Sequence, residues 1–193
     1  MTVLSHLVSV AIWLTIVFVK ARKQADDKPN LTPEVRRRRT FDKAIKLISA
    51  KSRSIAELRE RLLQYSWANK VDVETVISRL KEYGYLDDER FAFSYASLKV
   101  KQRPLGRRRM ERDLKFKKVD TAVADEALEL VYAETSEEEL IDRAIEKRVR
   151  LRGRPKNRLE AKSLFDHLLR QGFSFELVSD RVRAVSQSKF DEE

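Results

Sequence analysis

The chain has 193 residues, of which 42% are apolar and 37% are charged, and its formal net charge is +10. Its four glycines and four prolines are too few for the frequent turns of a many-stranded β fold, so we expect an all-α protein. The lack of cysteine excludes disulfides and thiolate metal sites. The positive charge favours a polyanionic neighbour, which is nucleic acid, an acidic membrane or an acidic protein.

The first segment differs in composition from the rest of the chain. Residues 3–19 carry no formal charge and are just long enough to span a bilayer, and Lys20, Arg22 and Lys23 follow them. Three interpretations of residues 1–19 stay open: a short membrane anchor, a leader translated from a non-native upstream start, or a segment folded onto the domain. Residues 20–33 are typical of a polar linker. In each case we expect the domain that follows to be cytoplasmic.

The remaining chain predicts nine helices in an elongated array of three tandem three-helix repeats, at 34–86, 87–134 and 135–187, with a tail at 188–193. Three stretches spaced by roughly fifty residues carry this signal. Each has an apolar residue before a candidate N-cap and another apolar residue four positions after it, which is the spacing of a hydrophobic staple. The three sets are Val71, Asp72 and Val76, then Val119, Asp120 and Ala124, then Phe173, Ser174 and Val178.

Other helix boundaries are marked by capping residues and by breaks. Thr32-Pro33-Glu34 opens the first helix, and Ser54, Asp87 and Ser136 are further N-cap candidates. Gly84 and Gly172 stand where helices are expected to end. Breaks at residues 104–106 and 153–155 fall at matching places in the second and third repeats.

Catalytic signals are nearly absent. His6 lies in the leader, and His167 has no serine or cysteine partner at a recognisable spacing, so we interpret it as an ordinary helical surface or boundary histidine. Asp87-Asp88-Glu89 resembles part of a metal site, but helix N-capping explains these carboxylates with fewer assumptions. We therefore expect a protein that works by binding, with no catalytic residue, no metal and no cofactor.

Basic residues gather in three clusters, the first at residues 36–39. Two further clusters flank the corresponding loops of the second and third repeats, and their arginines suit paired hydrogen bonds to phosphate or carboxylate. The alternative for any single cluster is a solvated face. The candidate binding residues are Arg103, Arg107, Arg108, Arg109, Arg112, Lys115, Arg150, Arg152, Arg154 and Lys156. Four aromatic residues, Tyr65, Trp67, Tyr83 and Tyr85, could stack on bases, although their spacing favours a place in the core.

Residues 80–92, LKEYGYLDDERFA, resemble the signature of the RecX family of regulatory proteins. Residues 54–58, 106–110 and 170–174 resemble other recurrent elements of that family, in the same order. The resemblance covers about residues 40–187. Its signature positions, which we interpret as mainly structural, are Tyr83, Gly84, Tyr85, Leu86, Asp87, Asp88, Phe91, Ala92, Gly172 and Phe173. The family usually has glycine where this chain has Lys118, and the apolar leader is not a family feature.

The resemblance implies a non-enzymatic, monomeric modulator of the RecA recombinase that lies in the groove of the RecA filament on single- or double-stranded DNA. Such a protein opposes filament growth and acts in DNA repair, recombination and the SOS response. Three other functions stay open: a helical nucleic-acid-binding protein that acts without a recombinase, an adaptor tethered to a membrane through residues 3–19, and a phosphodiester-cleaving enzyme.

Overall fold

The computed structural model describes residues 31–187, and this range contains nine α-helices and no strand. The helices are α2 (Pro33–Ala50), α3 (Ile55–Leu63), α4 (Lys70–Glu82), α5 (Asp88–Gln102), α6 (Arg107–Phe116), α7 (Thr121–Glu134), α8 (Glu137–Arg152), α9 (Arg158–Gln171) and α10 (Phe175–Gln187). The expected all-α fold is confirmed. The leader, most of the linker and the tail lie outside the described residues.

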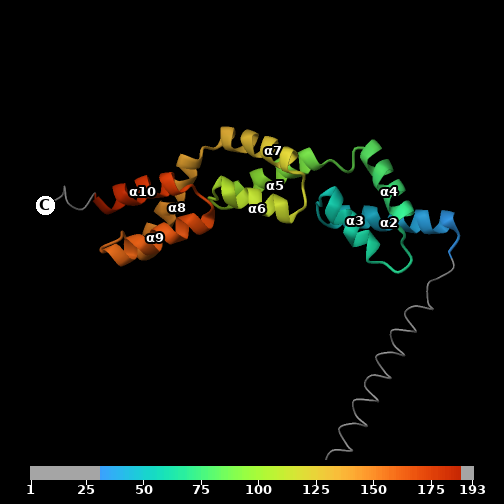
Figure 1. Cartoon of the computed structure of the whole chain (residues 1–193), viewed down its shortest axis with the longest axis horizontal. Helices are drawn as coiled ribbons and strands as arrows, with labels where there is room; N and C mark the ends of the chain where they lie inside the picture. The colour runs from blue at the N-terminus through green and yellow to red at the C-terminus, as the bar shows by residue number, and fades with distance from the viewer. Residues whose placement is uncertain (1–30, 188–193) are drawn as a thin grey trace, which may run out of the picture.

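The helices form an elongated row of three groups (Figure 1). Group 1 is α2–α4, group 2 is α5–α7 and group 3 is α8–α10, and the most extensive helix contacts all lie within a group. The origin of the three groups as diverged copies of one repeat stays a prediction. Among residues 31–187, no helix has both the length and the apolar character needed to cross a bilayer.

Side-chain caps fix where most helices begin, because the first backbone N–H groups of a helix need acceptors. Thr32, Ser54, Asp87, Asp120 and Ser136 accept from backbone N–H groups at the starts of their helices. The predicted caps at these positions are therefore confirmed, as is Ser174, whose hydroxyl accepts from the N–H of Leu177 at 3.2 Å. Val119 and Phe173, each the first residue of a predicted hydrophobic staple, are also buried as expected.

The prediction for the start of α4 was wrong. Asn69 is the N-cap and accepts from the N–H of Asp72 at 2.8 Å, so α4 begins three residues earlier than expected. Val71, predicted to be half of a staple, is 74% exposed. Asp72 instead lies in the first turn with its side chain buried against α2, a contact that only the folded chain brings together.

The apolar core is divided unevenly among the three groups. Group 1 has a core of its own, built from Ala44, Leu58, Leu62, Val73, Val76, Ile77, Leu80 and Leu86. Groups 2 and 3 share one continuous core that runs from Phe91 to Val182. A three-helix group buries little apolar surface alone, so the shared core makes groups 2 and 3 the more strongly coupled pair.

Two glycines allow the backbones of groups 2 and 3 to touch. The N–H of Gly106 donates to the carbonyl of Gln171 at 3.0 Å, and the N–H of Arg108 donates to the carbonyl of Gly172 at 3.2 Å. A Cβ on Gly172 would overlap the backbone of Arg109, and a Cβ on Gly106 would overlap Gly172 and Phe173. Gly172 also ends α9 at a φ of +94°. Close approach thus explains why glycine stands at both positions.

The junction between groups 1 and 2 is polar. The Ser54 hydroxyl donates to the carbonyl of Lys117 at 2.5 Å, and the Asp88 carboxylate accepts from the N–H of Ile55 at 2.9 Å. Lys117 pairs with Glu57 at 2.8 Å, and Lys118 pairs with Glu60. Burial raises the pKa of Asp88 above its usual value, and the hydrogen bond from Ile55 partly opposes this shift. Hydrogen bonds and ion pairs, not a shared core, connect these two groups.

We predict that Gly172→Ala lowers the free energy of unfolding by about 2–3 kcal/mol, because it adds both backbone strain and a clash with Arg109. Gly84→Ala is the matched control: its φ is +70° but nothing lies within 4 Å of the added Cβ, so we expect a loss of only about 1 kcal/mol. Urea unfolding followed by circular dichroism measures both. Equal losses would show that the close approach contributes nothing.

A second prediction concerns Lys118, which adopts a φ of +57° where glycine would be unstrained. Lys118→Gly is expected to raise the free energy of unfolding by about 0.5–1 kcal/mol, because the relief of left-handed strain exceeds the loss of one exposed ion pair. Glu60→Gln removes the same ion pair without changing the backbone and serves as control. A less stable glycine variant, with Glu60→Gln neutral, would contradict the strain at Lys118.

Candidate polyanion-binding surface

Helix α6 carries an exposed basic stripe. It buries only Met110 and Leu114 and presents its other side to solvent. Arg108, Arg112 and Lys115 are all exposed and follow an i, i+4, i+7 spacing, so they lie along one face of the helix. We call these three residues the α6 stripe.

The pairing of charges on α6 separates the predicted arginines into two kinds. Arg107 pairs with Glu111 at 3.2 Å, and Arg109 pairs with Asp113 at 3.1 Å. Among the described residues, no carboxylate lies within ion-pair range of the α6 stripe. The α6 stripe therefore supplies the cations of α6 that can bind an external anion.

A second basic site forms where groups 2 and 3 meet. A pocket of about 290 Å³ lies between the turn that follows α5 and the helices α8 and α9. Its lining residues are Arg103, Pro104, Ala144, Lys147, Arg148, Leu151, His167 and Gln171. We call it the junction pocket. Arg103, predicted from the sequence, contributes to it, whereas Lys147, Arg148 and His167 were not among the candidates.

Burial and like charges together disfavour the charged forms of residues in the junction pocket. Burial and the nearby Arg148, Arg170 and Arg152 lower the pKa of His167 below its usual value. Burial, Arg152 and Arg170 likewise lower the pKa of Arg148. The Arg148 guanidinium donates through Nη2 to the Ser163 hydroxyl at 3.4 Å, a long hydrogen bond to an acceptor that carries no charge. A bound anion would relieve the repulsion among these cations, so the pocket suits a phosphate or carboxylate.

Four other predicted binding residues lie outside the lining of the junction pocket. Arg150 and Arg152 lie in the last turn of α8, and Arg154 and Lys156 lie in the loop that precedes α9. All four are exposed. Arg152 lines a second hollow of about 240 Å³ next to Arg148. Its one acidic lining residue, Glu160, accepts from the backbone N–H of Lys156 at 2.8 Å and so fixes the loop.

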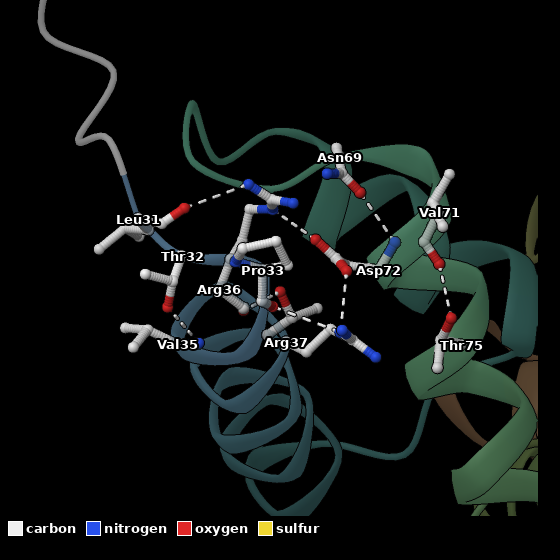
Figure 2. Close-up of polar contacts among 11 residues, drawn as sticks. Leu31, Thr32, Pro33, Val35, Arg36, Arg37, Asn69, Val71, Asp72 and Thr75 are labelled. Atoms are coloured by element: carbon white, nitrogen blue, oxygen red, sulfur yellow. Dashed lines mark hydrogen bonds and ion pairs between the residues drawn. The ribbon is translucent and has the colours of Figure 1, made fainter.

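The first basic cluster has a structural role at its N-terminal end (Figure 2). Arg36 pairs with Asp72, and the Nε of Arg37 lies 3.5 Å from the other carboxylate oxygen. The Asp72 side chain is only 5% exposed. A buried carboxylate between two guanidinium groups braces α2 against α4, so these two arginines are less available to a polyanion than the α6 stripe.

The signature residues divide between core and surface. Leu86, Phe91, Ala92 and Phe173 are buried, and their mainly structural role stays a prediction. Tyr83 is 55% exposed and Tyr85 is 60% exposed, so the expectation that these two rings belong to the core was wrong. The helical spacing that suggested burial does not apply, because both rings lie in or next to the turn that ends α4.

Comparison with known proteins agrees with this architecture. The family model described as "RecX, second three-helix domain" matches residues 87–128, which are α5, α6 and the first half of α7. The regulatory protein RecX of Chlorobium limicola is 31% identical over 147 residues, which cover 75% of this chain and 88% of the relative. This chain belongs to the RecX family.

Further relatives carry the same name. The RecX protein of Treponema pallidum is 37% identical over 110 residues, which cover 57% of this chain and 66% of that protein. The chain spans 57% of the RecX protein of Bacillus licheniformis, at 30% identity. The crystal structure of RecX from Lactobacillus salivarius superposes with a TM-score of 0.67 at 19% identity and covers 78% of this chain and 96% of its own. It shares the fold.

We predict that His167 titrates with a midpoint below the usual value of about 6.5, because burial and three arginines disfavour its charged form. Its proton NMR signal, separated from that of His6 by the His6→Gln variant, measures the midpoint. Adding a polyanion, or raising the salt concentration, should move the midpoint upward, since both reduce the repulsion from the arginines. A midpoint at or above 6.5 in low salt would contradict the clustering of cations at the junction pocket.

Proposed function

We propose that this protein binds RecA and the RecA–DNA filament and inhibits recombinase activity, and that it thereby modulates DNA repair, recombination and the SOS response. The observation that carries this proposal is membership of the RecX family, whose relatives are named regulatory proteins. The protein acts by binding, as a monomer in the cytoplasm, without a catalytic residue or a cofactor.

The geometry supports a filament as the partner. A row of three helix groups offers a long surface, so weak contacts with successive filament subunits add up through effective concentration. The α6 stripe and the junction pocket supply cations in group 2 and at the junction with group 3. Arginine-rich sites of this kind can pair with DNA phosphates or with acidic side chains.

The direct test is RecA's ATP hydrolysis on single-stranded DNA with the full chain added at substoichiometric amounts. We expect a lower steady-state rate and shorter filaments in electron micrographs. A protein that binds DNA yet leaves both unchanged would exclude the proposed function and favour the alternative, a nucleic-acid-binding protein that acts without a recombinase.

Paired and unpaired arginines of α6 should differ in this assay. We expect Arg108→Ala with Arg112→Ala to raise the half-inhibitory concentration several-fold. For binding to single-stranded DNA, the slope of log affinity against log salt concentration should become shallower by about 0.7 for each phosphate that the variant no longer neutralises. The matched control is Arg107→Ala with Arg109→Ala, which removes the same charge from the same helix but from residues already paired. Equal effects of the two double variants would contradict a specific role of the stripe.

A further inference from the structure

Group 1 has a hollow whose lining differs from the basic sites of groups 2 and 3. It has a volume of about 410 Å³ and lies between α2 and the loop that joins α3 to α4. Its lining residues are Arg39, Asp42, Lys43, Lys46, Tyr65 and Trp67. Three of these are cations at i, i+4 and i+7 on α2, so they lie along one face of that helix. We call this feature the aromatic hollow.

The two rings of the aromatic hollow stack on each other, and we call this stacked pair the platform. Tyr65 and Trp67 stack with their ring centroids 5.2 Å apart and their planes 23° apart. The Arg39 guanidinium carbon lies 4.7 Å from the centroid of Trp67, and the Lys43 ammonium lies 4.9 Å from that of Tyr65. The platform thus already binds cations through its π faces.

Core packing does not account for these rings. Both are half-buried, and neither is among the apolar side chains that pack on the group 1 core, although their neighbour Ala68 is. The interpretation of Tyr65 and Trp67 as core residues was therefore wrong. A large aromatic pair held at the surface of a loop, beside three cations, is an arrangement that a ligand with both flat rings and negative charge would complete.

We propose that the aromatic hollow binds an unpaired nucleotide of single-stranded nucleic acid, with the base stacked on the Tyr65–Trp67 platform and the flanking phosphates on Lys43 and Lys46. Base–aromatic stacking beside a basic groove is how sequence-independent single-strand binding works. Arg39 is exposed, so an incoming base displaces its guanidinium from Trp67 toward a phosphate. The hollow has the volume of a small-ligand site.

The chemistry favours a single strand over the other polyanions. In a duplex, each base is already stacked on its neighbours, so its faces are not available to the platform. An acidic peptide would pair with the cations but leave the ring faces unused. Asp42, the one acidic lining residue, adds a repulsive charge that both phosphate and carboxylate ligands must avoid, so it does not discriminate between them.

This inference rests on the proposed function for its setting, a filament assembled on DNA, but its test needs only the protein and an oligonucleotide. The chain has two tryptophans, Trp13 and Trp67, so Trp13→Phe in the full chain leaves Trp67 as the only indole. We expect a twenty-residue oligo-dT to quench the emission of Trp67. An abasic oligomer of the same length and the corresponding duplex should bind without that quenching.

Binding measurements complete the test. In the Trp13→Phe background, Trp67→Ala should weaken oligo-dT binding about tenfold, the scale of a single base-stacking interaction, whereas Trp67→Phe should retain most of the affinity. Phe175→Ala, an exposed aromatic on α10, is the control and should change nothing. The double variant Lys43→Ala with Lys46→Ala should bind oligo-dT with a weaker dependence on salt, and the oligo-dT that does bind should still quench the emission of Trp67.

Three outcomes would overturn the inference. These are an unchanged Trp67 emission with oligo-dT, equal quenching by the abasic oligomer, or unaltered affinity of a folded Trp67→Ala variant. Equal quenching by a poly-glutamate peptide would assign the hollow to an acidic protein segment instead. If Trp67→Ala fails to fold, the emission of the unaltered Trp67 still decides. Inhibition of RecA by a protein that fails these tests would leave the proposed function standing.

Discussion

The approach of Gly106 to Gly172 is the constraint on which the arrangement of groups 2 and 3 depends. With no Cβ at either residue, the start of α6 hydrogen-bonds to the end of α9 through backbone atoms alone. The Glu137 side chain then accepts from the N–H of Arg107 at 2.7 Å, which caps a helix whose own N-cap is a glycine. Tyr132 adds a hydrogen bond to the carbonyl of Leu105 at 2.9 Å. The start of α6 is thus completed by atoms from α7, α8 and α9, and this fixes the direction in which the α6 stripe points.

The same contact creates the junction pocket. Because the chain preceding Gly106 must reach the end of α9, the turn after α5 brings Arg103 beside Arg148 and His167. No local motif requires that meeting. The arginines that add to burial in lowering the pKa of His167 are Arg148, Arg170 and Arg152, which all lie on α8 and α9. That repulsion therefore arises within group 3, and the contact with group 2 adds Arg103 to the same pocket.

Features that depend on residues close together in the sequence could be predicted. Features that depend on contacts between distant residues could not. Caps such as Ser54 and Asp120 could be predicted because a cap involves residues within one turn. The start of α4 was missed because Asn69 and Asp72 are both good caps, and only the buried pairing with Arg36 decides between them. In the candidate site, the basic content of α6 was apparent from the sequence. Which arginines Glu111 and Asp113 would engage, and which residues would join Arg103, depended on side-chain and tertiary geometry.

Salt concentration affects the junction between groups 1 and 2 and the junction between groups 2 and 3 differently. The contact between groups 2 and 3 is apolar and backbone-mediated, so salt has little effect on it. The contact between groups 1 and 2 includes ion pairs such as Lys118 with Glu60, whose side chains are 50% and 56% exposed and which salt therefore screens. Binding of phosphates weakens with salt for the same reason. Salt thus weakens an ion pair of this junction and the binding of phosphates alike, while the hydrogen bonds of Ser54 and Asp88 still connect groups 1 and 2.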